Sequence, residues 1–411
     1  MQAVEPKPIP SRVRPFEKTQ APTPWYMKTL LKRDMAPTAE EYDRLIAALW
    51  QGDGPMDTLV EWMFEYGPGD AKALIEQAVV KGVGTIEDCP QPLLDFFETL
   101  ETPPAWIDQE LVEEGVRFIH GIGITAEYVL RDLALMGGYL LSGFNQSLVL
   151  TGALNKGAAK RIAETGKWWI DCTEPYGLTR YGVGFKSTIH VRMIHSLVRR
   201  NLAKKPQWDS SKWGLPLSQI DMVATYLGFS VVLLGGLRKL GVPVTPRESK
   251  AVMHLWAYAC WIMGVEEKWL VQTEREGIVL LNHTYMTQSK PDDTSRELAQ
   301  ALADEPLERT YKRFEKLRRQ FSYHQHLSIS QYFLGDKKIG DLGLPKSSSW
   351  YALLSTPPRF ASYTSQRFNP LARKAQQKHG RRQQKAMLGA MFGQSEHGVI
   401  APDEHHPAHV Q

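Results

Sequence analysis

The second half of the chain contains the run Val-Met-His-Leu-Trp-Ala-Tyr-Ala-Cys-Trp-Ile-Met at residues 252–263, which is apolar on nearly every side of a helix. The start of this helix is well marked, because Thr245, Pro246 and Glu248 are the residue types preferred at the N-cap and at the first and third helical positions. A helix that is apolar all round lies inside a bundle rather than on its surface. The sequence therefore predicts a central helix over 246–264, with other helices packed around it.

Helical patterns also dominate on both sides of this run. A capping box formed by Thr38 and Glu41 opens an early helix, and shorter patterns follow at 56–66, 70–82 and 91–101. Longer patterns lie at 108–120, 124–143, 156–171, 184–202, 216–239, 293–303 and 306–321. The sequence contains no alternating runs with hairpin turns and no solenoid period, so the expected fold class is all-α.

Composition divides the chain into four regions. Residues 1–35 are rich in Pro, Lys and Arg and predict an extended N-terminal arm, while residues 36–107 predict an N-terminal helical region. Residues 108–345 hold the long helical patterns and form the expected main domain. Residues 346–411 predict an irregular basic tail, in which the segment 373–385 has the charge to touch anionic lipid.

Charge and cysteine content exclude several classes of protein. A formal net charge of +4 over 411 residues does not indicate nucleic acid as a partner, which requires clustered Lys and Arg. Cys89, Cys172 and Cys260 lie far apart and form neither a disulfide framework nor a zinc motif. No CxxCH motif occurs, so any haem would be bound non-covalently.

The sequence also bears on location. The first residues lack the charged and apolar segments of a secretory signal, so we expect a cytoplasmic protein. Contact of the basic segment 373–385 with lipid would make it membrane-peripheral. The apolar stretch 133–154 contains Asn145 and Gln146, and the stretch 222–237 is shorter than a bilayer span. We expect both stretches to be buried core helices.

Two polar clusters on adjacent predicted helices are the candidates for chemistry. Arg161 and Thr165 are four residues apart and share a helix face, as do Arg192, His195 and Arg199 at i, i+3 and i+7. The histidine is surrounded by apolar neighbours, namely Val191, Ile194 and Val198. A neutral imidazole in such a setting, flanked by guanidiniums, suits an axial haem ligand with partners for the propionates. The alternative is a hydrogen-bonded core histidine beside two surface arginines.

The other histidines give weaker signals. His254 lies in the apolar run and is expected to be a hydrogen-bonded core residue. His324 and His326 alternate and fit one face of a strand, but no carboxylate lies close in sequence to complete a metal site. His405, His406 and His409 form a weak metal-binding tract in the tail. The HExxH, GxSxG, GxGxxG and Walker motifs are absent, so hydrolase, dehydrogenase and P-loop functions have no support.

Residues 108–345 resemble the latex clearing protein (rubber oxygenase) and the related MpaB-type oxygenase family. The resemblance lies in the order of several elements: Arg161-x-x-x-Thr165 with 167–171, the segment Phe185–Thr188 leading to Val191–His195 and Arg199-Arg200, then 213–219, 240–243, the Trp256 helix, 332–336 and 342–345. It implies an all-α fold with a globin-like helical core and additional N- and C-terminal helices. It also implies one non-covalent haem b, so that residues 108–345 would be a haem-binding oxygenase domain.

The resemblance assigns roles by position. His195 matches the proximal iron ligand, Arg161 and Thr165 match distal-side residues, and Arg192 and Arg199 match arginines that serve the cofactor or the polarity of its pocket. Glu164 stands where the rubber-cleaving enzymes have a lysine that occupies the iron in a closed state. A carboxylate binds haem iron poorly, so we expect an open or water-ligated sixth site, with Glu164 as a candidate base.

A second departure lies upstream, where Asn145 and Gln146 occupy the region in which rubber oxygenases are expected to carry a catalytic carboxylate. The leading hypothesis is a haem b-dependent oxygenase that uses dioxygen to cleave or oxidise a C=C bond of an apolar isoprenoid-like or prenylated substrate. The alternatives are a haem-dependent peroxidase or isomerase acting on a lipid or secondary metabolite, and a non-catalytic helical lipid-binding protein. The sequence does not define the oligomeric state.

Overall fold

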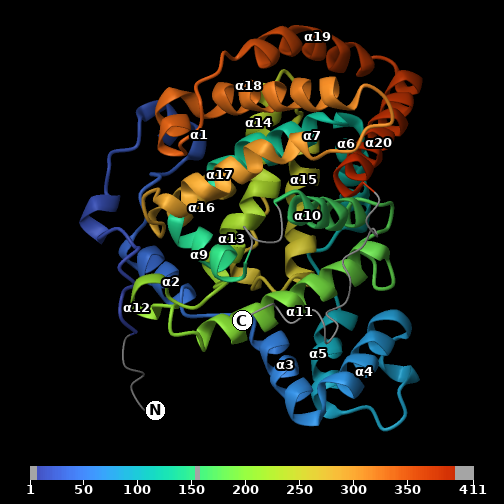
Figure 1. Ribbon diagram of the computed structural model, residues 1–411. Helices are drawn as coiled ribbons and strands as arrows, with labels where there is room; N and C mark the ends of the chain where they lie inside the picture. The colour runs from blue at the N-terminus through green and yellow to red at the C-terminus, as the bar shows by residue number, and fades with distance from the viewer. Residues whose placement is uncertain (1–6, 153–157, 394–411) are drawn as a thin grey trace.

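The structure is a computed structural model that describes residues 7–152 and 158–393. Within these ranges all regular structure is helical and no strand occurs (Figure 1). The predicted all-α fold class is therefore confirmed. The capping boxes predicted at Thr38 and Glu41 and at Thr245 and Glu248 are also present, each with both of its reciprocal hydrogen bonds.

The helices follow one another along the chain in three groups. The N-terminal group comprises η1 (Phe16–Thr19), α1 (Trp25–Leu31), α2 (Ala39–Ala48), α3 (Gly54–Tyr66), α4 (Pro68–Lys81), η2 (Val83–Thr85) and α5 (Gln91–Glu101). The central group comprises α6 (Gln109–Ile122), α7 (Thr125–Val129), η3 (Leu130–Leu135), α8 (Met136–Gly138), α9 (Ser142–Leu150), α10 (Ala158–Cys172), α11 (Val183–Ala203), α12 (Ser210–Trp213), α13 (Gln219–Leu227), η4 (Gly228–Val232), α14 (Leu233–Lys239) and α15 (Pro246–Ile262). The C-terminal group comprises η5 (Glu267–Trp269), α16 (Glu274–Met286), α17 (Asp293–Asp304), η6 (Glu305–Leu307), α18 (Glu315–Asp341), α19 (Trp350–Gln366) and α20 (Pro370–Phe392).

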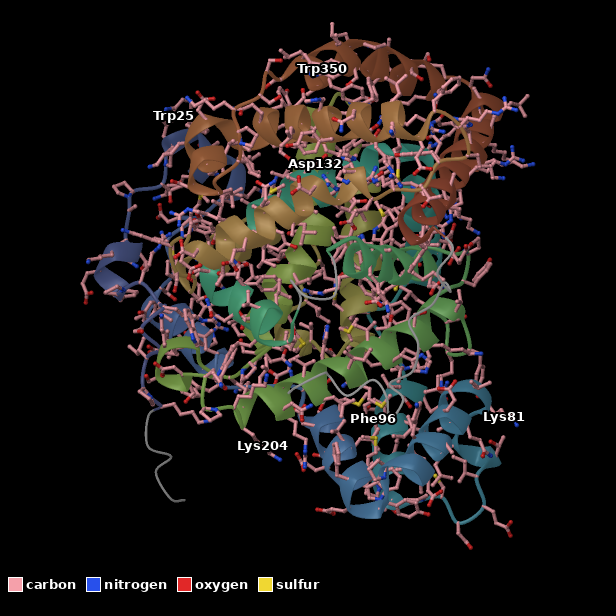
Figure 2. All side chains as sticks on the ribbon, in the orientation of Figure 1. Trp25, Lys81, Phe96, Asp132, Lys204 and Trp350 are labelled. Carbon is pink, nitrogen blue, oxygen red and sulfur yellow. The ribbon has the colours of Figure 1, made fainter. Side chains whose placement is uncertain are left out.

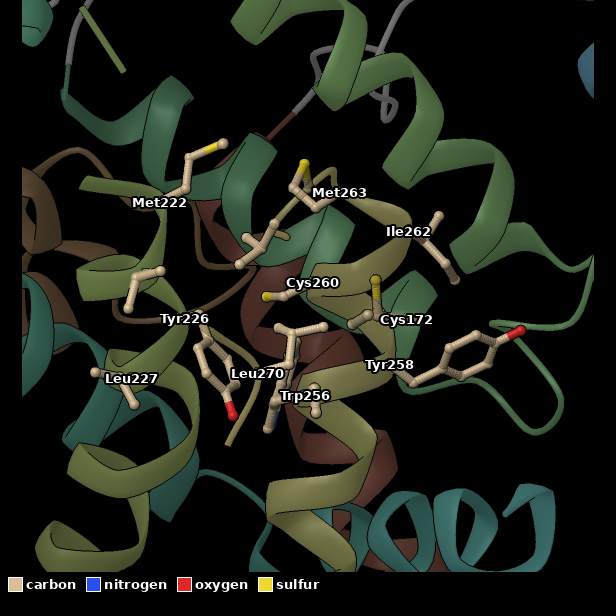
Figure 3. Packing of buried hydrophobic residues seen from close by; sticks show 14 of the residues in the cluster. Cys172, Met222, Tyr226, Leu227, Trp256, Tyr258, Cys260, Ile262, Met263 and Leu270 are labelled. Atoms are coloured by element: carbon tan, nitrogen blue, oxygen red, sulfur yellow. The ribbon is translucent and has the colours of Figure 1, made fainter. Parts of the chain in front are cut away.

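Helix α15 lies at the centre of the molecule, as the apolar run predicts. Every residue from Ala251 to Cys260 is buried, and α15 packs on α6, α11, α13 and α16. Figure 3 shows Trp256 and Cys260 of this helix in the core beside residues of α13 and α10. Gly115 lets α6 approach closely, because an added Cβ would lie 2.7 Å from the carbonyl oxygen of Ala251. The body of the central helix is thus buried on all sides.

Two segments of π-helix interrupt the helices beside α15. The first, η3, continues α7 into α8, and the second, η4, joins α13 to α14; the two π-helical segments pack against each other. The segment Gln219–Lys239 is long and apolar enough to cross a membrane, but 67% of its most apolar stretch is buried inside the protein, as expected of a core helix. A second apolar pair, Thr125–Gly138 and Ser142–Leu150, is bent by 96°.

The prediction of an irregular basic tail over 346–411 is wrong for the residues that the structure describes there. Helix α19 lies over α18, and α20 returns along α6 and α10 (Figure 1). Helix α20 packs on the protein through Gly380, Arg381 and Gln384. Because none of these side chains is apolar, the buried face of α20 gives no apolar periodicity in the sequence. Arg381 donates to the Ile170 carbonyl at 2.6 Å. The histidines at 405, 406 and 409 lie outside the described residues.

The predicted extended arm is also partly wrong. Residues 1–35 contain η1 and α1, and Arg12 is buried, with its Nη2 at 2.9 and 3.0 Å from the two carboxylate oxygens of Asp221. A buried guanidinium paired with a carboxylate ties the arm to α13. Helix α18 begins at Glu315 rather than at 306. It contains His324 and His326, whose alternation would also have fitted one face of a strand. Helix α16 had no predicted counterpart.

Candidate functional site

Helices α10 and α11 form an antiparallel pair joined by a short connection, and they bring the two predicted polar clusters together. The indole nitrogen of Trp168 donates to Thr188 Oγ1 at 3.0 Å, which aligns these two residues across the pair. Arg161 lies seven positions before Trp168, and His195 lies seven positions after Thr188. Because each residue advances a helix by about 1.5 Å, Arg161 and His195 fall at the same level of the pair. We take this level of the helix pair as the candidate site, with one wall on each helix.

His195 is half-buried, and its Nδ1 is buried without a hydrogen-bond partner among the described residues. Burial lowers the pKa of His195 from its ordinary value of 6.5 to about 4, and the nearby Arg199 cation acts in the same direction. The imidazole is therefore neutral at physiological pH. A core histidine of the ordinary kind finds partners for both nitrogens, as His254 does with the Asp108 amide and Gln272.

The α10 wall of the candidate site ranges from half-buried to exposed. Burial lowers the pKa of the Arg161 guanidinium, while the nearby Tyr139 and Glu164 act in the opposite direction. Glu164 is half-buried and Thr165 is exposed. The structure therefore groups Arg161 with Glu164 and with Tyr139, a buried residue that the sequence did not single out.

Arg192 and Arg199 are paired with carboxylates of α3 and of the residue before it. Arg192 Nε lies 2.5 Å from Asp53 Oδ2, its Nη2 lies 2.7 Å from Asp53 Oδ1, and its Nη1 donates to the Ile262 carbonyl. Arg199 Nε lies 2.9 Å from Asp57 Oδ2, and its Nη1 donates to the Leu217 carbonyl at 2.8 Å.

These pairs change the interpretation of the two arginines. A direct bond from Arg192 to a cofactor would break a buried ion pair, which costs several kcal/mol. Arg199 retains one buried nitrogen, Nη2, without a partner among the described residues. The prediction that both bind a cofactor remains untested, and the geometry favours Arg192 as a residue that fixes the helix carrying His195.

Asn145 occupies a buried position close to Tyr139. Its Nδ2 donates to the Tyr139 carbonyl at 2.8 Å and to Ser295 Oγ at 3.2 Å, while its Oδ1 is buried without a partner in the described part of the chain. Gln146 is half-buried and bonds back to the Ser142 carbonyl. Asn145 is thus held in place with one acceptor free, and it carries no proton for acid–base chemistry.

A second polar centre was not predicted. Side chains from α7, η3, η6, α18 and the residues after η6 form a buried network, whose members are Glu127, Arg131, Asp132, Glu305, Arg309 and His326. Arg131 and Arg309 both contact Glu305, and Arg309 also reaches Glu127 at 2.7 Å. His326 Nδ1 lies 2.7 Å from Asp132 Oδ2. The alternating histidine noted in the sequence therefore pairs with a residue of another helix.

Burial shifts the pKa values of three groups in this network. Burial raises the pKa of Asp132 to about 7, against the opposing effect of Arg131. Burial also lowers the pKa of His326 well below 6.5. Although burial opposes ionisation of Glu305, Arg309 and Arg131 hold its pKa at about 2. When Asp132 is protonated, two carboxylates face two guanidiniums and their charges balance.

The comparisons with known proteins agree with this fold. Residues 126–362 match the family described as "ER-bound oxygenase mpaB/B'/Rubber oxygenase, catalytic domain", which is more than half of the chain. The chain belongs to this family of oxygenase catalytic domains, as the resemblance in the sequence indicated.

Two individual proteins are similar to this chain. The rubber oxygenase of Streptomyces sp. (strain K30) is 26% identical over 191 residues, which cover 45% of this chain and 46% of that relative, so the match spans less than half of the relative's length. The structure of the latex clearing protein LCP in the closed state has a TM-score of 0.62 at 18% identity and covers 87% of this chain and 95% of that chain. The second likeness concerns the fold.

The depressed pKa of His195 predicts an acid-sensitive stability. Between pH 6.5 and 4 the unfolded chain takes up a proton on this histidine and the folded protein does not, so stability falls as the pH falls through this window. We expect His195→Leu to reduce that loss by about 1 kcal/mol per pH unit. Urea unfolding of both proteins without haem, at a series of pH values, measures the difference. Parallel curves would contradict the buried neutral state.

Proposed function

We propose that this protein is a haem b-dependent oxygenase that cleaves or oxidises a C=C bond of an apolar isoprenoid-like or prenylated molecule. Membership of an oxygenase family supports the reaction class. The name of the relative, rubber oxygenase, supports an isoprenoid alkene as the kind of substrate. The proposed location remains the cytoplasm, with peripheral membrane contact.

One observation carries the haem assignment. His195 is a neutral imidazole with a buried Nδ1 that lacks a partner among the described residues, and it lies level with Arg161 on the neighbouring helix. A neutral imidazole is the form that binds iron, and no described residue competes for His195 Nδ1. These residues fit a haem, which when bound would supply the activation of dioxygen.

One residue of the site would bind the iron, and two others would make the opposite wall polar. His195 would hold the iron, while the pairs Arg192–Asp53 and Arg199–Asp57 hold its helix against α3. Arg161 would direct guanidinium donors at developing negative charge on the opposite side, where a preorganised donor is most effective in a site that excludes water. Thr165 would add a hydroxyl to the same wall.

Glu164 places a carboxylate in this wall, where a lysine-bearing site has an ammonium group. Its half-buried carboxylate lies near Arg161 and acts on the pKa of that guanidinium. A carboxylate is a poor iron ligand, so Glu164 would stay free of the iron. We propose that it orients Arg161 and accepts a proton from substrate or water. The apolar segments that meet at η3 and η4 would form the walls for the substrate.

Isotopically labelled dioxygen tests the reaction class. Purified protein supplied with haem is incubated with an oligo-isoprenoid alkene under the labelled gas, and the products are analysed by mass spectrometry. We expect carbonyl products that carry the label. Unlabelled products would contradict an oxygenase and would favour a peroxidase or isomerase.

A matched pair of variants separates catalysis from cofactor binding in the same assay. Arg161→Gln is expected to retain haem and lose activity by about a hundredfold, the usual effect of removing one preorganised donor. Lys160→Gln is the control, because this exposed neighbour loses the same charge. Loss of haem from Arg161→Gln would assign Arg161 a structural role instead.

A further inference from the structure

An exposed apolar surface lies where the start of α18 meets the start of α19, at the top of the molecule in Figure 1. We call it the α18–α19 patch, and its members are Phe314, Leu317, Phe321, Trp350, Leu353 and Leu354. Phe314 is 78% exposed, and Leu317 and Leu354 are each 71% exposed. The rings of Phe321 and Trp350 lie 6.0 Å apart and join the two helices into one surface. A contiguous apolar surface of this kind marks an interaction site.

The backbone of Phe314 adds a second observation. This residue precedes α18 with φ 52° and ψ 40°, a left-handed conformation that is costly for a bulky side chain. Asn or Gly would fit the same backbone without strain. The fold therefore gains nothing from a phenylalanine here, and the ring points into solvent.

Positive charge surrounds the patch. Lys312, Arg313 and Lys316 are exposed, and none has an ion-pair partner among the described residues. Residues 342–393 contain nine Lys and Arg and no Asp or Glu, although the whole chain has a net charge of only +4. The rest of the chain is therefore net acidic, and the excess of cations lies in the C-terminal helices.

We propose that the α18–α19 patch docks on an anionic lipid bilayer, with its apolar side chains in the interface and its cations on the headgroups. Exposed aromatic and leucine side chains beside Lys and Arg are the combination that binds such an interface. A second copy of the chain is a poorer occupant, because a two-fold contact would bring these cations against themselves. This inference is independent of the haem.

The proposal relocates the contact expected at 373–385. Arg373 pairs with Glu248, and Arg381 and Lys385 pair with Glu174, so these three point toward the protein. The remaining cations, Lys374, Lys378 and Arg382, are exposed at i, i+4 and i+8 and lack ion-pair partners in the described part of the chain. Helix α20 thus adds long-range attraction, while the α18–α19 patch supplies the apolar contact.

Sedimentation with lipid vesicles tests the proposal on the full chain. The protein is expected to bind vesicles of phosphatidylcholine mixed with phosphatidylserine, and to bind pure phosphatidylcholine weakly. Phe314→Asn should reduce binding roughly tenfold, as for loss of one buried aromatic side chain, and should leave the thermal unfolding temperature unchanged or raised. Lys312→Gln with Lys316→Gln should reduce binding by roughly fivefold for each charge.

The controls lie at the other end of the molecule. Lys81→Gln with Lys204→Gln removes the same charge far from Trp350, as Figure 2 shows, and should leave binding within about twofold of the original protein. Equal losses in both lysine pairs would mean that net charge alone drives binding and would overturn the patch. Absence of binding to the anionic vesicles would also overturn it. So would dimers that Phe314→Asn abolishes, since a second copy would then cover the patch.

Discussion

Replacement of His195 by alanine is expected to abolish haem binding, with a loss of affinity of about a hundredfold or more. Mutation of residues that merely support a metal ligand costs 10–100-fold in affinity, so loss of the ligand itself costs at least as much. The fold should survive, because no hydrogen bond of the described residues is lost with this side chain. Titration with haem, followed by the Soret band of the reduced protein with carbon monoxide, measures the effect.

His190 provides the control on the same helix. It is half-buried, and its Nε2 lies 2.8 Å from Glu76 Oε2, so its replacement by alanine removes a histidine with a protein partner. We expect His190→Ala to bind haem like the original protein. An unchanged Soret band in His195→Ala, or equal losses in both variants, would contradict His195 as the iron ligand.

Replacement of Arg309 by methionine is expected to destabilise the protein by about 3–5 kcal/mol, which is the cost of leaving a buried carboxylate without its partner. The Arg309 side chain is 1% exposed, and it contacts both Glu305 and Glu127 at 2.7 Å. Methionine keeps most of the volume, so the effect reports the lost charge. Urea or thermal unfolding measures it.

Arg296 is a matched arginine on the surface. It pairs with Asp293 three residues earlier in α17, and both side chains are more than half exposed. We expect Arg296→Met to cost no more than about 1 kcal/mol, as exposed ion pairs usually do. If both variants lost a similar free energy of unfolding, the buried network would contribute little to stability. Arg309→Lys should then leave the free energy of unfolding unchanged as well.

Much of the fold could be predicted because its signals are local. The central helix α15 and its cap depend on residues within a few positions of one another, and the structure has both as predicted. The packing of α10 on α11 is equally local, since the two helices are neighbours along the chain and pair directly. That Arg161 and His195 act in one site stays a prediction.

The remainder depends on contacts between distant residues, which spacing does not reveal. Arg192 finds Asp53 across 139 positions, and His326 finds Asp132 across 194. The sequence alone does not show whether an arginine is buried, because burial depends on a carboxylate partner elsewhere in the chain. Helix α20 escaped prediction for a related reason, because it docks through Gly380 and Arg381 rather than through an apolar stripe.

The π-helical segment η3 lies on the stretch of chain that joins the two polar centres. A π-helix closes its hydrogen bonds over five residues instead of four, so it contains an extra residue relative to an α-helix. Asp132 lies within η3 and contacts His326, and Tyr139 follows α8 on the same stretch and acts on the pKa of Arg161. A one-residue deletion in η3 would therefore fall on the only direct chain segment between Asp132 and Tyr139, so a single lesion there can reach both centres.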